Sequence, residues 1–154
     1  RVPFKIDMEA DKREEQNDVS EKSITGLHIL LAEDNELNME IAEFMLQNEG
    51  AEVTKAWNGQ EAVERFRKSK PGEFDVILMD IMLPVMNGYE AAKRIRSLDR
   101  EDARRIPIIA MTANAFTEDR LKAKEAGMDE HISKPVDVKL LLKTIHQLVE
   151  NSQR

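Results

Sequence analysis

The chain contains no cysteine, which excludes disulfide bonds, thiolate metal sites and a cysteine nucleophile. It has no hydrophobic run near the roughly 18 residues that a membrane span requires, and no signal-peptide pattern at its start. Acidic residues outnumber basic ones by 30 to 23, so the net charge of −7 disfavours a general nucleic-acid surface. These absences predict a soluble, cytoplasmic segment that binds no nucleic acid and makes no membrane contact. Its 154 residues are enough for one domain and little more.

The first 25 residues differ in pattern from the rest of the chain. Residues 1–7 alternate as a strand does, but a strand this short cannot stand without a sheet to join. Residues 8–25 are rich in charged side chains and cannot bury enough apolar surface to offset the ordering of the chain. A solvated helix is one interpretation of this stretch, and a charged linker is the favoured one.

From residue 26 onward, apolar runs typical of strands alternate with segments of helical periodicity. The predicted strands cover residues 27–32, 53–57, 76–79, 106–111 and 130–133. In the first predicted helix, Leu37, Ile41, Phe44 and Met45 recur at helical spacing. Five strands that alternate with five helices predict an α/β fold, in which a doubly wound parallel sheet has helices on both faces.

One of these strands ends abruptly in a carboxylate. Residues 76–79 are wholly apolar, which is typical of a strand buried on both faces of a parallel sheet, and Asp80 follows directly. Pro84 stiffens the next loop, and Asn87 then opens a helix with Glu90 as its capping-box partner. An aspartate between a buried strand and a short rigid loop is a candidate nucleophile or metal ligand.

Candidate functional side chains follow four of the five predicted strands. They are Glu33 and Asp34 after the first strand, Asp80 after the third, Thr112 after the fourth and Lys134 after the fifth. The carboxyl ends of parallel strands share one edge of the sheet, so these side chains should converge in one crevice. Each has an ordinary interpretation on its own, as a helix cap, a strand-end hydroxyl or a surface lysine.

Their combination is more specific. Three neighbouring carboxylates repel one another unless a cation lies among them, and oxygen ligands without histidine or cysteine suit magnesium. A hydroxyl and an ammonium group opposite the metal are what a phosphoryl group requires. The sequence therefore predicts a carboxylate nucleophile, Mg²⁺ and two groups that bind a phosphoryl group.

Residues 26–151 resemble the receiver domain of bacterial two-component response regulators, followed by a short tail at 152–154. The motifs that carry the resemblance are Ala32-Glu33-Asp34-Asn35, Met79 to Glu90, Met111-Thr112-Ala113 and Ser133-Lys134-Pro135. The resemblance implies a flavodoxin-like sheet of strand order 2-1-3-4-5. It also implies a phosphorelay function, with a histidine kinase phosphodonor domain and a histidine phosphotransfer protein as partners.

The resemblance assigns a role to each candidate residue. It implies that Asp80 accepts a phosphoryl group from a phosphohistidine. The implied Mg²⁺ ligands are Asp34, Asp80 and the backbone carbonyl of Met82, with Glu33 as an assisting ligand. Thr112 and Lys134 are implied to bind the phosphoryl oxygens. On this interpretation the isolated domain is a phosphoacceptor and not a turnover enzyme.

The chain departs from the family pattern at three positions. Leu83 stands where methionine is frequent and Asn87 where aspartate is frequent, and neither touches the expected chemistry. His131 stands on the fifth strand where tyrosine or phenylalanine is usual. In the family this aromatic ring turns inward when the threonine moves toward the phosphoryl group, so Thr112 and His131 are the candidate switch residues. The alternative is that His131 stays exposed in both states and that Thr112 and the loop after it carry the switch alone.

The start of the chain carries a second resemblance. Residues 2–6, Val-Pro-Phe-Lys-Ile, resemble the last strand of a histidine-kinase ATP-binding domain. Residues 1–7 are therefore interpreted as the end of such a domain. The chain would then be the C-terminal receiver of a hybrid sensor kinase that can be membrane-anchored, with the phosphodonor in the same chain.

Three other functions fit the sequence less well. A haloacid-dehalogenase-like phosphatase also uses an aspartyl nucleophile with Mg²⁺, but it requires an aspartate two residues later, where this chain has Met82. A receiver that serves only as an interaction module would normally have lost an acidic residue or the lysine, and none is lost here. Mononucleotide binding lacks a glycine-rich phosphate loop.

Overall fold

The computed structural model describes residues 24–113, 117–134 and 136–152. The predicted kinase strand at residues 1–7 and the predicted linker up to residue 23 lie outside the described residues, as do residues 153–154 of the predicted tail.

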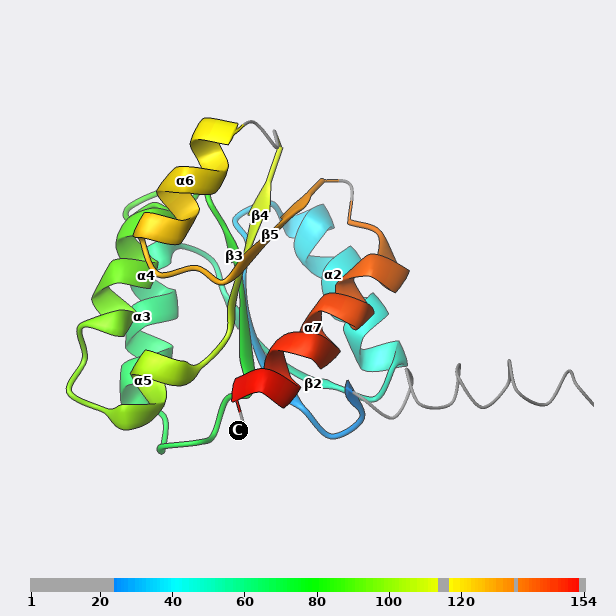
Figure 1. The fold of residues 1–154 in the computed structure, drawn as a ribbon. Helices are drawn as coiled ribbons and strands as arrows, with labels where there is room; N and C mark the ends of the chain where they lie inside the picture. The colour runs from blue at the N-terminus through cyan, green and yellow to red at the C-terminus, as the bar shows by residue number, and fades with distance from the viewer. Residues whose placement is uncertain (1–23, 114–116, 135, 153–154) are drawn as a thin grey trace, which may run out of the picture.

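A single parallel sheet runs through the centre of the molecule (Figure 1). Its strands are β1 (His28–Ala32), β2 (Glu52–Ala56), β3 (Val76–Asp80), β4 (Ile108–Thr112) and β5 (Glu130–Ser133). They are ordered β2-β1-β3-β4-β5, which confirms the predicted order 2-1-3-4-5. Asp80 and Thr112 are the last residues of their strands, each one position beyond the predicted end, so hydrogen bonding within the sheet fixes the backbone of both.

Two layers of helices cover the sheet. The described helices are α2 (Glu36–Asn48), α3 (Gly59–Lys68), α4 (Gly88–Arg96), α5 (Glu101–Arg105), α6 (Thr117–Glu125) and α7 (Val138–Ser152). Helices α2 and α7 lie on one face of the sheet, and α3, α4, α5 and α6 lie on the other (Figure 1). None of the helices in these described ranges is long and apolar enough to cross a membrane.

The short helix α5 is absent from the prediction, which had five helices. Its position depends on Arg100, whose guanidinium group donates to the backbone oxygens of Phe66 (2.7 Å) and Ser69 (3.0 Å) at the end of α3. The same group pairs with the carboxylate of Asp102 at 2.7 Å. Five residues are too few to show helical periodicity, so contacts distant in the sequence determine this element.

Each face of the sheet has its own apolar core. Strand β3 is buried along its whole length, as predicted for a central strand. Leu30 and Ile77 pack toward α3 and α4, whereas Leu31 and Leu78 pack toward α2 and α7. Ile24 is fully buried in the second of these cores, so the packed domain extends two residues before Gly26.

Helix α2 has apolar side chains on its exposed face as well as on its buried face. The predicted helix is confirmed, and Met39, Ala42 and Leu46 are the residues that it buries. Leu37 and Phe44 are 64% and 70% exposed. The helix therefore presents apolar side chains to solvent in addition to those that it packs against the sheet.

Candidate functional site

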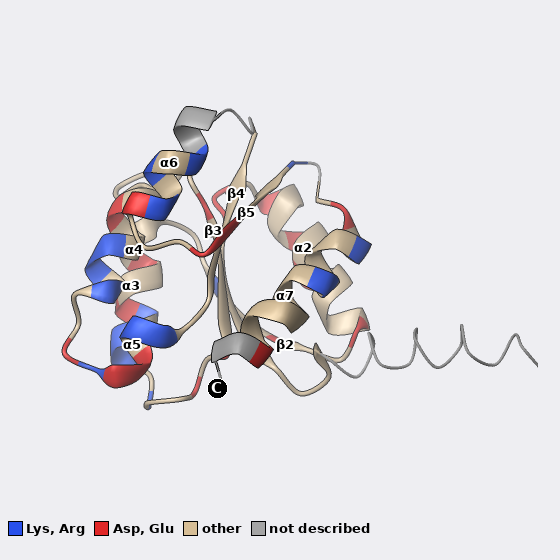
Figure 2. Ribbon diagram, viewed as in Figure 1, with Lys and Arg blue, Asp and Glu red and all other residues tan. Residues whose placement is uncertain are grey.

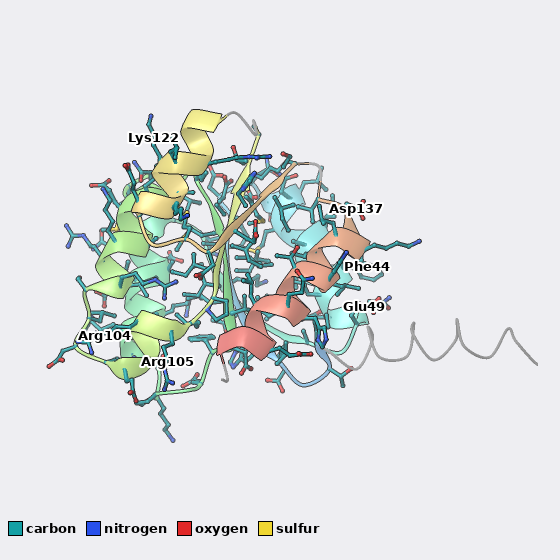
Figure 3. All side chains as sticks on the ribbon, in the orientation of Figure 1. Phe44, Glu49, Arg104, Arg105, Lys122 and Asp137 are labelled. Atoms are coloured by element: carbon teal, nitrogen blue, oxygen red, sulfur yellow. The ribbon has the colours of Figure 1, made fainter. Side chains whose placement is uncertain are left out.

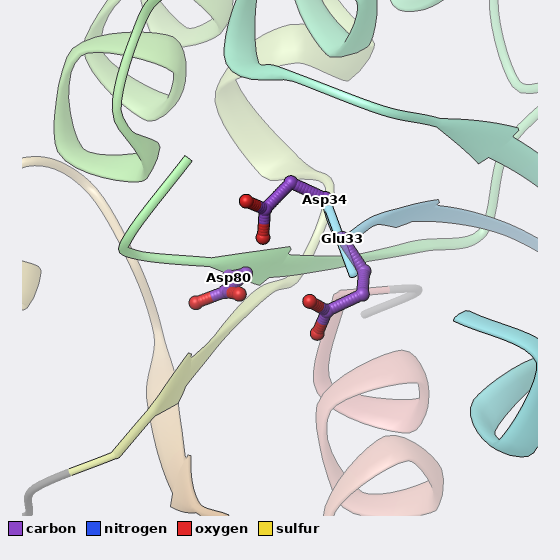
Figure 4. Close-up of side chains that lie close together, drawn as sticks. All are labelled: Glu33, Asp34 and Asp80. Carbon is purple, nitrogen blue, oxygen red and sulfur yellow. The ribbon is translucent and has the colours of Figure 1, made fainter. Parts of the chain in front are cut away.

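Three carboxylates meet at the carboxyl ends of β1 and β3 (Figure 4). Glu33 and Asp34 directly follow β1, and Asp80 is the last residue of β3, the central strand, which lies next to β1. One oxygen from each of the three side chains lies within 4.8 Å of the others, which is close enough for all three to ligate one metal ion. Glu33 and Asp80 are each only 3% exposed, whereas Asp34 is exposed. The predicted convergence at the sheet edge is confirmed for these residues.

Lys134 approaches the two buried carboxylates from the end of β5. Its Nζ donates to Asp80 Oδ2 at 2.8 Å and to Glu33 Oε1 at 2.9 Å. Burial alone would lower the pKa of Lys134, but the hydrogen bonds to Asp80 and Glu33 and their negative charges outweigh it and raise the pKa above its ordinary value. The ammonium group therefore remains charged and offsets part of the repulsion within the cluster.

Backbone amides hold the second oxygen of each buried carboxylate. The N–H of Met82 donates to Asp80 Oδ1 at 3.1 Å, and the N–H of Asn35 donates to Glu33 Oε2 at 3.1 Å. Each carboxylate thus has one oxygen on Lys134 and the other on the loop that follows its own strand. Both carboxylates are therefore oriented before any ligand binds. Such preorganisation favours the binding of a cation and the stabilisation of charge at a fixed position.

Residues 29–146 match the profile of the response regulator receiver domain. The chain is a member of this family. The match covers four strands in full and β1 from its second residue, and it includes every candidate site residue.

This receiver domain is similar to parts of longer signalling proteins. It is 36% identical to Histidine kinase 1 of Arabidopsis thaliana over 165 residues, a stretch that covers 86% of this chain and 14% of that protein. The chain therefore spans only a small part of the length of such relatives.

Two solved structures are also similar. The receiver domain of a sensor histidine kinase from Pseudomonas aeruginosa, with a magnesium ion coordinated in its active site cleft, is 39% identical. Its TM-score is 0.73, with 82% of this chain and 99% of that chain covered. The receiver domain of Ssk1 from Saccharomyces cerevisiae, crystallised with the histidine phosphotransfer protein Ypd1, is 31% identical with a TM-score of 0.71. That match covers 81% of this chain and 90% of the other.

The two candidate switch residues of this receiver domain lie on β4 and β5. Thr112 is buried, and its backbone oxygen accepts a hydrogen bond from the N–H of Lys134 at 2.8 Å. His131 lies on the edge strand β5 opposite Ala110 and is half-buried. It lines a surface hollow beside Arg120 and Lys124 and is not part of the carboxylate cluster.

Sequence reasoning did not identify the amides of Asn35 and Met82 as supports of the site. Every residue except proline has such a donor, so no residue type marks these positions. The predicted N-cap at Asn87 is confirmed, since its side chain accepts from the N–H of Glu90 at 2.9 Å. Asn35 also caps α2 by accepting from the N–H of Asn38, so the carboxylate-bearing loop runs directly into a fixed helix.

Proposed function

We propose that this receiver domain accepts a phosphoryl group on Asp80 from a phosphohistidine and that the reaction requires Mg²⁺. The observation that carries the proposal is the position of the Lys134 ammonium group, which bridges Asp80 and Glu33 at the carboxyl edge of the sheet. A carboxylate that receives a phosphoryl group gains negative charge, and a fixed cation beside it lowers the free energy of that state.

Each polar group has a distinct role in the proposed reaction. An oxygen of Asp80 forms a bond to phosphorus while the bond from phosphorus to the donor imidazole nitrogen breaks, and the imidazole leaves with that electron pair. Lys134 and the Thr112 hydroxyl bind the phosphoryl oxygens. The proposed metal ligands are Asp34, Asp80 and the backbone carbonyl of Met82, with Glu33 assisting. Bound Mg²⁺ would supply positive charge between these carboxylates and the phosphoryl group.

The donor set fits this metal. Three carboxylates, two of them nearly buried, leave a net negative charge after Lys134 has paired with two of them. Magnesium commonly binds through one or two carboxylates together with a substrate phosphate, and the cluster offers carboxylates at that spacing. The related receiver from Pseudomonas aeruginosa, with its coordinated magnesium ion, supports the same assignment.

A small phosphodonor tests the proposal. With phosphoramidate and Mg²⁺, we expect Asp80 to form an acyl phosphate that is stable in acid and labile in base. Asp80→Asn should abolish the label and leave the fold intact, because a strand-end carboxylate contributes little packing. Asp34→Asn should raise the dissociation constant of Mg²⁺. Label that persists in Asp80→Asn would place the nucleophile elsewhere.

We also propose that the phosphodonor docks on the exposed apolar face of α2. This helix starts two residues after Asp34, and Leu37, Ile41 and Phe44 lie exposed along it; Phe44 is labelled in Figure 3. A cavity of about 150 Å³ between α2 and the segment after β5 is lined by Ile41 and Lys134 among others, so the apolar face is continuous with the site. The crystallised pair of Ssk1 and Ypd1 supports a histidine phosphotransfer protein as this class of partner.

Charge distinguishes this surface from the other side of the sheet. Glu36 and Glu40 are exposed on α2, whereas lysine and arginine side chains gather on α4 and α5 (Figure 2). The donor surface should therefore be apolar with a basic rim. Phe44→Asp is expected to slow phosphotransfer from a phosphorylated histidine phosphotransfer protein but not from phosphoramidate, and Lys122→Asp on α6 is the control. Equal slowing with both donors would contradict docking on α2.

The proposed parent of the chain is a hybrid histidine kinase. In this arrangement residues 1–7 end its ATP-binding domain, residues 8–23 form a charged linker, and the receiver, which begins at the buried Ile24, lies on the cytoplasmic side. The similarity to Histidine kinase 1, of which the chain matches only 14%, supports this origin. The upstream sequence of the parent tests it, since a dimerisation helix with a phosphorylatable histidine is expected there.

The proposed output switch is the pair Thr112 and His131. The two residues lie on adjacent strands, with His131 opposite Ala110 and Thr112 opposite Ser133. A displacement at the end of β4 can therefore displace β5, which carries His131. The imidazole resonances of His131 should move when a phosphoryl mimic binds with Mg²⁺. Unchanged resonances would leave the switch to Thr112 alone.

A further inference from the structure

The loop between β3 and α4, residues 81–87, carries the Met82 carbonyl that the proposed function assigns to the metal. We infer that Gly59, the first residue of α3, is a positioning residue for this loop and thereby for metal binding at the site. This inference rests on the proposed function, because the role of the Met82 carbonyl does. Gly59 belongs to another element and touches none of the three carboxylates of the cluster.

Gly59 is in direct contact with the backbone of the loop. A Cβ atom built on Gly59 would lie 1.9 Å from the carbonyl oxygen of Met86, 2.7 Å from its carbonyl carbon and 3.1 Å from the carbonyl oxygen of Asn87. All three are backbone atoms, so no side-chain rotation can relieve the overlap. The φ angle of Gly59 is outside the left-handed region, so glycine is required there for space and not for backbone conformation.

The helix end that carries Gly59 is held in place. The side chain of Asn58 accepts from the N–H of Glu61 at 2.8 Å, and the side chain of Glu61 accepts from the N–H of Trp57 at 2.9 Å. These two hydrogen bonds tie the first turn of α3 to the two residues that precede it. The helix also buries Ala62 and Phe66 against the sheet. A side chain at position 59 would therefore displace the loop and not the helix.

The loop is confined on its other side by α4. A Cβ atom built on Gly88 would lie 2.4 Å from the carbonyl oxygen of Asp80 and 2.9 Å from Cα of Ile81, and the N–H of Gly88 donates to the carbonyl oxygen of Ile81 at 2.9 Å. The loop thus lies between two helix N-termini, with backbone contacts on both sides. Displacement of Met86 away from α3 cannot be absorbed at Gly88.

The bonds inside the loop carry such a displacement toward Met82. The N–H of Met86 donates to the carbonyl oxygen of Pro84 at 2.6 Å, and the N–H of Leu83 donates to the carbonyl oxygen of Ile81 at 3.1 Å. Leu83 is buried between Met82 and Pro84, so the two bonded segments are joined through the core-facing part of the loop. Met82 lies within the segment closed by the Leu83–Ile81 bond, and its own N–H donates to Asp80 Oδ1. A shift at Met86 therefore alters both the Met82 carbonyl and the support of Asp80.

The test is the variant Gly59→Ala, with Gln60→Ala as the matched control. Both place alanine in the first turn of α3, but Gln60 is exposed. Alanine is the better helix former, so a variant with no steric effect should be as stable as wild type or more so. We expect Gly59→Ala to raise the Mg²⁺ dissociation constant roughly tenfold, the loss typical of residues that support metal ligands from outside the ligand set. Gln60→Ala should leave the dissociation constant unchanged.

A second readout needs no metal. In the metal-free protein, the amide resonances of Met82, Leu83 and Met86 should shift in Gly59→Ala and not in Gln60→Ala. Weaker Mg²⁺ binding together with these shifts supports the inference. Unchanged Mg²⁺ affinity with a lowered urea midpoint would overturn it, because Gly59 would then serve packing alone.

Two further outcomes also decide the question. If Gly59→Ala does not fold, Glu61→Ala provides the test, since it releases the Trp57 N–H and loosens the same helix end. A severalfold weaker Mg²⁺ affinity in that variant supports the inference, and an unchanged affinity overturns it. If wild type binds no Mg²⁺, the proposed function fails, and the metal-free amide shifts alone decide whether Gly59 positions the loop.

Discussion

The substitution Lys134→Met removes one positive charge from the site and keeps most of the side-chain stem. The ammonium group pairs with Asp80 and Glu33, whose side chains are 5% and 3% exposed, while the lysine side chain is 24% exposed. Breaking a fully buried ion pair costs about 3–5 kcal/mol because the remaining charge is left unpaired. Since water reaches part of the lysine, we expect a loss of about 2–3 kcal/mol in the free energy of unfolding.

Urea denaturation at pH 7 without metal measures this loss. With an m-value of about 2 kcal/mol/M, the midpoint should fall by about 1 M or slightly more. Lys139→Met, at an exposed position of α7, is the control and should change the free energy by less than about 0.5 kcal/mol. Added Mg²⁺ should restore part of the stability of Lys134→Met, because it binds only the folded cluster and replaces the missing positive charge.

The pH dependence of the difference follows from the raised pKa of Lys134. A lysine whose pKa is higher in the folded state stabilises the protein fully below the unfolded-state value and less as the pH rises through the folded-state value. The gap between wild type and Lys134→Met should therefore stay constant through neutral pH and shrink only above the ordinary lysine pKa of 10.5. If Lys134→Met unfolds within about 0.5 kcal/mol of the Lys139→Met control, the two ion pairs behave as solvated surface pairs and the reasoning is refuted.

Three further predictions concern stability. Val85 has a φ of 67°, which costs a β-branched residue about 1–2 kcal/mol, so Val85→Asn should raise the urea midpoint; a lower midpoint would contradict this. Burial raises the pKa of Asp102, but the hydrogen bonds from Arg100 and Gly72 outweigh it and lower that pKa overall. Asp102→Asn should therefore lower the free energy of unfolding by about 1–2 kcal/mol at pH 7. This loss should disappear as the pH falls below 3.8, and a pH-independent loss would show that the charge of Asp102 is not responsible. A chain that begins at Ile24 should unfold at the same urea concentration as the full chain, whereas Ile24→Ala should lose about 2–4 kcal/mol, and a small loss would show that Ile24 is not part of the core.

The sequence was sufficient for the sheet and for the convergence of the acidic residues. Buried parallel strands produce short apolar runs with polar residues at their ends, and the topology brings those ends together. This is why Asp80 and Lys134 could be placed at one site although β4 lies between their strands. The fine geometry could not be predicted, because backbone amides such as that of Met82 carry no sequence signal.

Helix α2 shows a different limit of sequence reasoning. Leu37, Ile41 and Phe44 recur at helical spacing, which indicates a helix but not which of its faces is buried. The residues that pack against the sheet include Ala42, whose small side chain gives only a weak apolar signal. Helix α5 was missed for another reason, since it depends on the contact of Arg100 with the end of α3.

The ion pairs of Lys134 join parts of the chain that are synthesised far apart. Lys134 is separated from Glu33 by 101 residues and from Asp80 by 54 residues. Contacts of such long sequence separation form late, because loop closure must precede them. A chain emerging from the ribosome therefore lacks the complete site until β5 has joined the sheet. Only the completely folded domain should therefore accept a phosphoryl group. A partly synthesised receiver would not compete with the folded one for phosphoryl groups.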